Sequence, residues 1–211
     1  MAFPQRVKRY TPEEYYRLER DAEFKSDYYD GEIFPIGKVL AMAGGTARHS
    51  LISGNLVREI GNRVKGGPCT VYESNLRLKI LATGLRTYPD VNVYCEKLQR
   101  DEEDQDGETY TNPSVLFEVL SKSTEAYDRG FKADSYRQIK SLRAYGLVSQ
   151  TTAHIELFER QPDGLWVLRE AKGLEAVLSV PPLRIELPLA EAYDRVEFGP
   201  GDEPLSFPGE G

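Results

Sequence analysis

The chain has 211 residues, of which 40% are hydrophobic and 29% are charged, and its formal net charge is −7. This length suits one domain, and the balance of hydrophobic and charged residues excludes an intrinsically disordered chain. No stretch approaches the about 20 apolar residues of a membrane span, and no apolar core follows the basic N-terminus as it would in a secretory signal. We therefore expect a cytoplasmic protein without membrane contact.

Negative charge is concentrated in residues 96–108 and 197–211. We interpret both segments as solvated, and the rest of the chain is close to neutral. This distribution permits contact with DNA but does not indicate it, because no basic stripe stands out. We predict a single domain over residues 1–198, followed by a disordered acidic tail over residues 199–211.

Two helices are predicted in the first half of the chain. The Thr-Pro-Glu-Glu sequence at residues 11–14 can form a capping box, and this helix should end near Asp21. Residues 44–46 open the second helix, whose apolar side repeats every four residues over 52–64. Strands are expected at 26–29 and 32–36, joined by an Asp30-Gly31 turn, and at 39–43, 70–72, 76–81 and 91–95.

The second half begins with the apolar strand 115–120. Ser123 or Thr124 can cap a third helix over about 125–141. The remaining strands form an antiparallel meander at 144–149, 154–160, 165–171 and 175–180. Helices flanking a mixed sheet make the fold α/β or α+β.

The most informative residue is Glu118, because it interrupts an otherwise apolar strand. A strand that is apolar on both faces is normally central in its sheet. An ionised carboxylate in such a place costs several kcal/mol unless it is paired or binds a metal. The alternatives are an edge-strand glutamate paired with an arginine and a glutamate that faces solvent.

Asp90 follows Pro89, which cannot donate to a sheet and so marks the start of a strand. If this strand and that of Glu118 are neighbours, the two carboxylates converge at one end of the sheet. Two carboxylates with open coordination positions suit Mg²⁺ or Mn²⁺. Alternatively, Asp90 simply caps the strand.

Three further residues are candidates for the same site. Lys132 recurs with Asp128 and Tyr136 at every fourth position of the third helix, so it can border the sheet, or it can be a surface lysine paired with Asp128. His49 lies on the apolar side of the second helix, where it either packs in the core or reaches a metal or phosphate. Glu32 is either a third carboxylate or a solvated strand residue.

Other kinds of site lack their motifs. The sequence has no Walker loop, GxSxG or HExxH, and its two histidines, His49 and His154, are far apart. Cys69 and Cys95 form no CxxC motif and have no histidine nearby, which argues against a zinc site and against Cys/His catalysis. We expect both thiols to be free, in a reducing compartment.

Five motifs together resemble the Uma-two family of restriction endonucleases, within the PD-(D/E)xK nuclease superfamily: DGEIF at 30–34, AMAGGTARHSLISGNL at 41–56, YPDV at 88–91, FEVLSKST at 117–124 and YDRGFKADSY at 127–136. The resemblance extends from about residue 8 to 198, and the order and spacing of the motifs make it specific. It implies a restriction endonuclease-like fold, with a central mixed sheet flanked by helices and a C-terminal antiparallel meander. It also implies Mg²⁺-dependent hydrolysis of DNA phosphodiester bonds.

The resemblance assigns roles to four residues. Asp90 matches the aspartate of the PD motif and Glu118 the second carboxylate, and these two would hold the metal. Glu32 matches the acidic residue after the family's DG turn. His49 matches the family's histidine at a helix start.

Two positions depart from the family pattern. The superfamily's lysine should stand two residues after Glu118, where this chain has Leu120, so Lys132 from the following helix is the candidate. Asn75 stands where relatives often carry aspartate. In the implied mechanism the metal on Asp90 and Glu118 activates a water and polarises the phosphate, while Lys132 orients that water or neutralises charge.

Three functions are compatible with these features. The first is an active DNA endonuclease, expected to be a homodimer because cutting two strands favours two-fold symmetry. The second is a catalytically inactive nuclease-fold protein that binds nucleic acid or a protein. The third is a metal-dependent enzyme for another phosphate ester.

Overall fold

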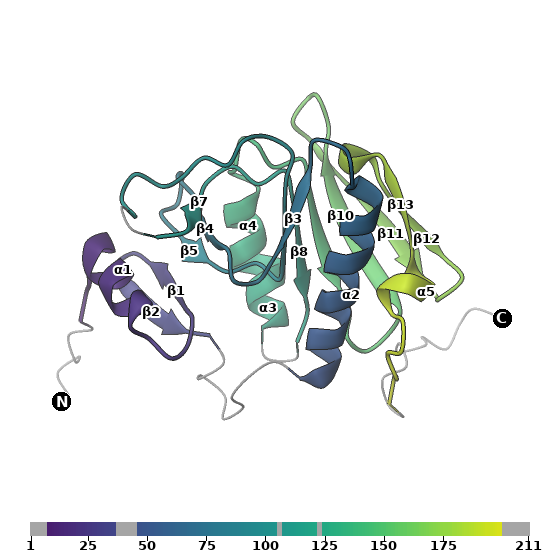
Figure 1. Ribbon diagram of the computed structural model, residues 1–211, viewed down its shortest axis with the longest axis horizontal. Helices are drawn as coiled ribbons and strands as arrows, with labels where there is room; N and C mark the ends of the chain where they lie inside the picture. Colours follow the sequence, from purple (N-terminus) through teal and green to yellow (C-terminus); the bar gives the residue numbers. More distant parts are fainter. Residues whose placement is uncertain (1–7, 37–45, 105–106, 122–123, 200–211) are drawn as a thin grey trace, which may run out of the picture.

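The computed structural model describes residues 8–36, 46–104, 107–121 and 124–199. Its centre is a six-stranded mixed sheet, accompanied by a five-stranded sheet and a two-stranded hairpin (Figure 1). The six-stranded sheet consists, in spatial order, of β11 (Trp166–Lys172), β10 (His154–Arg160), β9 (Ala144–Val148), β8 (Val115–Val119), β6 (Val91–Tyr94) and β3 (Thr70–Glu73). The five-stranded sheet consists of β2 (Glu32–Pro35), β1 (Ser26–Tyr29), β5 (Arg86–Thr87), β4 (Arg77–Lys79) and β7 (Thr109–Tyr110), and the hairpin of β12 (Val177–Val180) and β13 (Ile185–Pro188).

Helices cover both faces of the six-stranded sheet. The long helix α2 packs on one face, and the segment from α3 to α4 packs on the other. The helices are α1 (Pro12–Arg20), α2 (Ala47–Val64), α3 (Glu125–Tyr127), the π-helix η1 (Asp128–Lys132), α4 (Ala133–Tyr136), the 3₁₀-helix η2 (Pro181–Leu183) and α5 (Leu189–Ala192). Within the described ranges, no helix is long and apolar enough to cross a membrane.

The local signals at the N-terminal end of the chain are confirmed. Thr11 Oγ1 accepts the backbone N–H of Glu14 at 3.2 Å, and Glu14 Oε2 accepts that of Thr11 at 2.8 Å, which closes the predicted capping box. The turn at residues 30–31 joins β1 to β2 with φ angles of 46° and 81°. A two-residue hairpin needs such positive angles, because only these turns match the twist of the paired strands.

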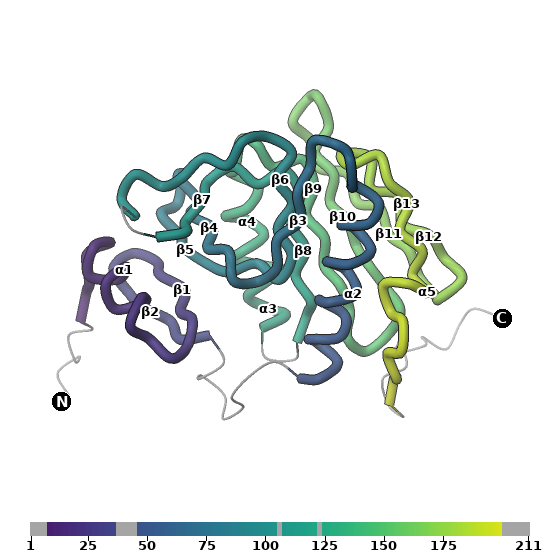
Figure 2. Tube along the Cα trace, viewed as in Figure 1, coloured from purple at the N-terminus to yellow at the C-terminus, as the bar shows by residue number. Residues whose placement is uncertain are grey.

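β8 is the central strand that its apolar sequence predicted, with β6 on one side and β9 on the other. Its alternate side chains face opposite layers. Phe117 and Val119 pack with α2, whereas Leu116 and Leu120 pack with α4, and Figure 2 shows these helical segments to either side of β8. Glu118 shares the face of Leu116 and Leu120, so its carboxylate enters the layer under α4.

The prediction of one helix over 125–141 is wrong in part. The segment starts as an α-helix, continues as a π-helix and ends at Tyr136, and Thr124 makes no side-chain cap. The meander is confirmed for β9, β10 and β11, but β12 pairs with β13 rather than with β11. The strand predicted at 39–43, Ser123 as a cap and residues 200–211 of the tail lie outside the described residues.

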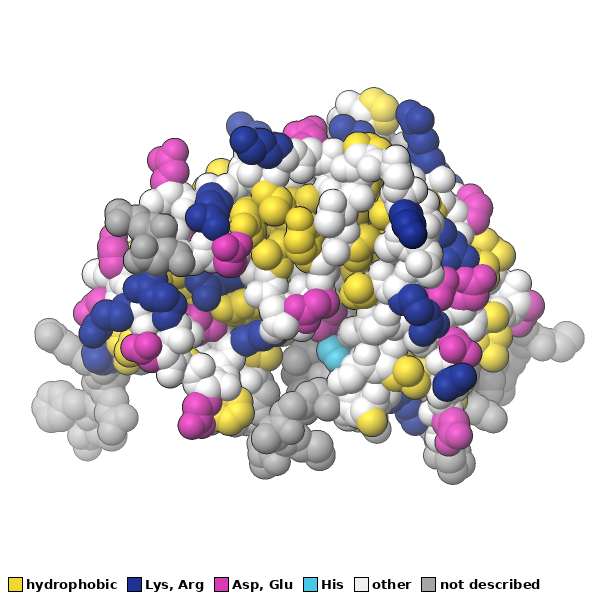
Figure 3. Space-filling view, viewed as in Figure 1, with side chains coloured by type: hydrophobic (Ala, Val, Ile, Leu, Met, Phe, Trp, Pro, Cys, Tyr) yellow, Lys and Arg dark blue, Asp and Glu magenta, His cyan; other side chains and the backbone are white. Residues whose placement is uncertain are grey.

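The acidic segment 96–108 is not simply solvated, as its composition suggested. Asp101 and Asp104 are 5% and 3% exposed. Lys79 Nζ contacts Asp101 Oδ1 at 2.7 Å, and Arg77 contacts Asp104 Oδ2 at 3.2 Å. The acids therefore neutralise bases on β4 that would otherwise be buried alone, and Figure 3 shows acidic and basic side chains interleaved at the α1 end of the molecule.

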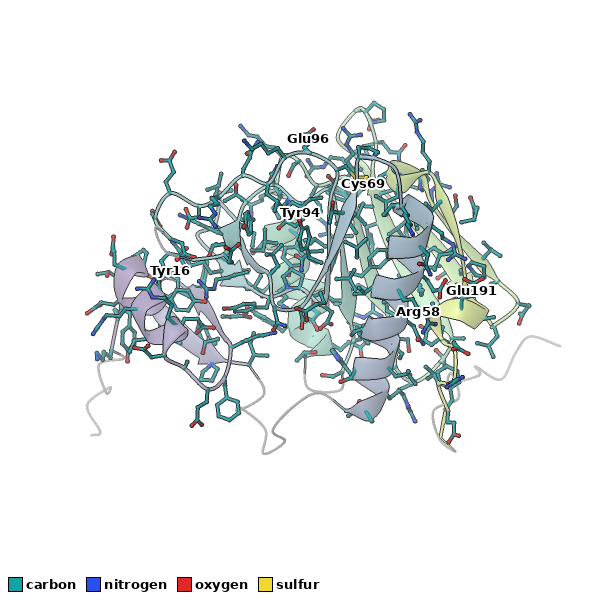
Figure 4. The ribbon with its side chains drawn as sticks, in the orientation of Figure 1. Tyr16, Arg58, Cys69, Tyr94, Glu96 and Glu191 are labelled. Atoms are coloured by element: carbon teal, nitrogen blue, oxygen red, sulfur yellow. A yellow bond between two sulfur atoms is a disulfide. The ribbon has the colours of Figure 1, made fainter. Side chains whose placement is uncertain are left out.

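The expectation of free thiols is also wrong, because Cys69 and Cys95 form a disulfide. β3 and β6 are antiparallel, with Thr70 opposite Tyr94, so the two cysteines follow as the next opposed pair. Figure 4 shows Cys69 at the end of β3. The cysteines lie 26 residues apart in sequence but face each other across the sheet, a proximity that depends on strand register.

Candidate active site

Strand register brings the two principal carboxylates together. Val91 of β6 pairs with Phe117 of β8, and the next opposed pair in this antiparallel register is Asp90 and Glu118. Directly opposed residues are neighbours across the two strands, so Asp90 lies beside Glu118 at the start of β6. Asp90 Oδ2 accepts the backbone N–H of Val119 at 2.7 Å, which fixes its side chain at the end of β8.

Glu118 is held by two donors from the segment that covers this face. Its side chain is buried, with 3% exposure. Lys132 Nζ donates to Oε1 at 3.0 Å, and Tyr136 Oη donates to the same oxygen at 2.6 Å. Among the residues that the structure describes, Glu118 has no arginine partner, and it is buried rather than facing solvent, so neither alternative that the sequence left open is observed.

Lys132 lies between two acids. In addition to Glu118, it contacts Asp128 Oδ1 at 3.3 Å. The pairing with Asp128 was one predicted alternative, but the lysine is buried rather than on the surface. Asp128 and Lys132 are the first and last residues of the π-helical turn, and both are buried there.

His49 reaches the site from the first turn of α2. Thr46 caps this helix by accepting the N–H of His49 at 3.1 Å, and the imidazole Nε2 lies 3.1 Å from Asp90 Oδ2. Burial lowers the pKa of His49, but its hydrogen bond with Asp90 and the charge of that carboxylate outweigh burial and raise it. Of the two predicted alternatives, the structure shows the contact with a site residue.

Asp27 is a fourth carboxylate that the sequence analysis missed. It lies on β1 with 5% exposure, and Tyr127 Oη donates to its Oδ2 at 3.2 Å. Its Oδ1 is buried and has no hydrogen-bond partner among the described residues. An acid in a predicted strand is the signal that singled out Glu118, but the short polar sequence SDYY gave no indication of burial.

The pKa values reflect an excess of buried negative charge. Burial, with the charges of Asp128 and Asp90, raises the pKa of Glu118 to about 8, although Lys132 acts in the opposite direction. Burial also raises the pKa of Asp27. For Lys132, burial lowers the pKa, but the surrounding acids outweigh it and raise the pKa well above its ordinary value. Four carboxylates around one lysine and one histidine form an environment that favours an added cation.

The structure places the remaining predicted residues elsewhere. Glu32 forms its ion pair with Arg9, at 3.6 Å, on the β1–β2 hairpin. Leu120, at the usual lysine position, is buried in the apolar layer under α4. Asn75 is exposed in the turn between β3 and β4, where its N–H donates to Glu73 at 3.1 Å. The catalytic role predicted for Glu32 stays a prediction.

The donor atoms suit a hard divalent cation. The hydrogen bonds to the central pair end on one oxygen of each carboxylate, Asp90 Oδ2 and Glu118 Oε1. Across the part of the chain that the structure describes, no three His, Cys, Asp or Glu side chains are grouped so as to hold a metal. If Mg²⁺ or Mn²⁺ binds here, Asp90 and Glu118 are the residues that would hold it, and waters would complete its coordination.

Comparisons with known proteins agree with this architecture. The model of the Uma2 family, described as "Putative restriction endonuclease", matches residues 12–190. Two proteins of Synechocystis sp., uncharacterized proteins slr1290 and sll1609, are 39% and 33% identical to the chain over 158 and 166 residues. These matches cover 75% and 79% of this chain and 78% and 89% of the relatives.

A solved structure is similar over most of its length. It is the crystal structure of a protein from Anabaena variabilis described as a "putative nuclease", with a TM-score of 0.65 and 19% sequence identity. The match covers 87% of this chain and 97% of that one. The restriction endonuclease-like fold predicted from the sequence is thereby confirmed.

Proposed function

The chain belongs to the Uma2 family, and from that premise we propose that it is a nuclease that hydrolyses DNA phosphodiester bonds with Mg²⁺ or Mn²⁺. The observation that carries the proposal is the opposed pair of Asp90 and Glu118 beside the buried Lys132. Two acids and a lysine at one end of a sheet suit this chemistry, because phosphoryl transfer needs charge neutralisation and an activated water.

Each side chain of the site has a distinct task. Asp90 and Glu118 would hold the cation, which when bound lowers the pKa of a bound water and polarises the scissile phosphate. Lys132 neutralises negative charge, and Tyr136 fixes the orientation of Glu118 through Oε1. His49 orients Asp90 through Oδ2 and can hold or release a proton there.

The direct test is cleavage of plasmid DNA in the presence of Mg²⁺ or Mn²⁺. The wild-type protein should nick or linearise the plasmid, and Asp90→Asn should abolish cleavage while its circular dichroism spectrum stays unchanged. Glu159→Gln is a matched control, because Glu159 pairs with Arg169 at 2.6 Å across β10 and β11, away from the site. Cleavage by Asp90→Asn at the wild-type rate would refute the assignment.

A catalytically inactive, nucleic-acid-binding protein is the second candidate. The observation that favours it is the engagement of Lys132 by two acids, Glu118 and Asp128, together with Leu120 at the usual lysine position. Calorimetric titration with Mn²⁺ separates the candidates. A nuclease should bind Mn²⁺ through Asp90, whereas an inactive descendant should bind DNA in EDTA and give no Mn²⁺ signal that depends on this residue.

We also propose that the active form is a homodimer, since two sites related by two-fold symmetry can address both strands. Sedimentation with and without duplex DNA checks this. A protein that cleaves both strands while remaining a monomer throughout would contradict it.

A further inference from the structure

An aromatic pocket lies next to the carboxylate site. It is open to solvent, has a volume of about 280 Å³ and is lined by Tyr29, Phe34, Tyr127 and Phe131. Phe131 is in edge contact with Tyr29, at 4.7 Å between ring centroids, and stacks on Tyr127 at 5.6 Å. Phe34 is 43% exposed, so one wall of the pocket is a phenyl ring that contributes little to the core.

The pocket and the site share a boundary. Phe34 pairs directly with Asp27 across β1 and β2, so both side chains lie on the same face of the hairpin. Tyr127 contributes its ring to the pocket and its hydroxyl group to Asp27, at 3.2 Å. Lys132 Nζ lies 5.8 Å from the centroid of the same ring. The ring of Tyr127 therefore borders the pocket on one side and Asp27 and Lys132 on the other.

The lining selects for a flat, aromatic ligand group. Four rings provide stacking surfaces, and none of the four lining residues is an acid or a base. Nucleobases stack on aromatic side chains with little dependence on sequence, because every base has a π face. A nucleotide joins such a ring to a phosphate, and this matches an aromatic pocket beside a site suited to phosphate chemistry.

We propose that this pocket binds an unpaired nucleobase of the substrate strand, adjacent to the phosphate at the carboxylate site. The inference rests on the proposed nuclease function and specifies its substrate. A base inside a duplex is stacked on both faces and cannot enter the pocket without being extruded. The preferred substrates are therefore single-stranded, bulged or frayed DNA, and the sequence preference is weak.

The test measures binding in EDTA, so that it does not depend on cleavage. The probe is a short single-stranded oligodeoxynucleotide with one 2-aminopurine, whose fluorescence is quenched when the base stacks. Wild-type protein should quench the probe, and Phe34→Ala should weaken binding about 5- to 100-fold and reduce the quenching. Phe34→Tyr keeps a ring and should restore both. Leu168→Ala, at a residue that is 47% exposed on β11, is a matched surface control.

The outcomes separate the two proposals. Equal binding and quenching by wild type and Phe34→Ala would refute the proposal that the pocket binds a base. The absence of quenching by wild type would refute it as well. If quenching depends on Phe34 but no DNA is cleaved with Mg²⁺ or Mn²⁺, the pocket stands and the nuclease proposal fails. If single-stranded and duplex DNA are cleaved equally by wild type and Phe34→Ala, the nuclease stands and the pocket proposal fails.

Discussion

Replacing Glu118 by glutamine should stabilise the metal-free protein, although it removes a residue of the proposed site. The folded carboxyl has a pKa of about 8, against an ordinary value of 4.5, mainly because it is buried. Between these values the folded state holds a proton that the unfolded chain releases. The contribution of Glu118 to stability is therefore fully present at low pH and is lost as the pH rises towards 8.

The size of the change in stability follows from the pH interval between the folded and the unfolded pKa of Glu118. Each pH unit within it changes the free energy of unfolding by about 1.4 kcal/mol for one such group, so the wild-type protein should lose about 2–3 kcal/mol between about pH 5.5 and about pH 7.5. Glutamine resembles the protonated acid and does not titrate. The difference in unfolding free energy between Glu118→Gln and wild type should therefore grow by this amount over the same range.

Urea unfolding in EDTA at several pH values measures this difference. The control is Glu159→Gln, which removes an acid that is paired with Arg169 away from the site, and this variant should not show the gain in stability that Glu118→Gln shows. Saturating Mg²⁺ should stabilise the wild-type protein and leave Glu118→Gln unchanged. A variant that is less stable than wild type at every pH, with a gap that does not depend on pH, would refute the reasoning.

Three further predictions concern other parts of the structure. Asp27→Asn should reduce Mn²⁺-supported cleavage about 10- to 100-fold with the fold retained, whereas Asp30→Asn on the exposed turn should not; equal activity of the two variants would exclude Asp27 from the site. The variant Cys69→Ser/Cys95→Ser should lose about 3 kcal/mol of unfolding free energy, and a reducing agent should lower the melting temperature of the wild type but not of this variant; a reductant effect on both would point to another cause. Gly146→Ala should destabilise the protein by about 1–3 kcal/mol in urea, because its Cβ would meet the Phe117 ring at 2.2 Å. Gly54→Ala, with no atom near the new Cβ in the middle of α2, should instead stabilise it by about 0.5–1 kcal/mol, and a loss there similar to that at Gly146 would contradict this explanation.

Elements with short-range determinants could be predicted from the sequence. The capping box of Thr11 and Glu14 and the turn at residues 30–31 depend on neighbours in the chain, and both form as expected. β5 and β7 have two residues each, too few to show any periodicity, and neither was predicted. β7 pairs with residues of β4 that lie 32 positions earlier, and β5 pairs with Tyr28 of β1 as well as with β4, so the positions of both strands depend on contacts distant in the sequence.

The helix over 125–141 was misjudged for a different reason. A capping residue and the recurrence of Asp128, Lys132 and Tyr136 at every fourth position predicted one continuous helix, but this spacing carries no information about which side chains must reach a buried charge. In the structure, Lys132 and Tyr136 both reach Glu118, and the backbone between Asp128 and Ala133 widens into a π turn. A buried carboxylate needs hydrogen-bond donors, and for Glu118 these donors come from another element of the fold. Local sequence spacing does not reveal this requirement.

The part of the site that could be predicted consists of residues whose local sequence pattern also fixes their position in the sheet. Asp90 at a strand start and Glu118 within an apolar strand were both recognisable, and their pairing needed only that the strands be neighbours. Asp27 was missed because its burial depends on Tyr127, a hundred residues further along the chain. Asp101 was taken as solvated because composition could not reveal Lys79 beneath it.

The π turn also affects how the following helix α4 is oriented about its axis. The backbone N–H of Ala133 donates to the carbonyl oxygen of Asp128, five residues earlier, so this segment accommodates one residue more than an α-helical turn. Deleting a single residue there would restore an ordinary α-helical turn, and the chain beyond it would keep its orientation because the π turn has already absorbed the extra residue. Tyr136 would then still face Glu118. The same deletion after Ala133, where the helix has no extra residue to lose, would instead rotate Tyr136 about 100° away from Glu118, so the chain should tolerate the loss of Arg129 or Gly130 better than that of Asp134 or Ser135.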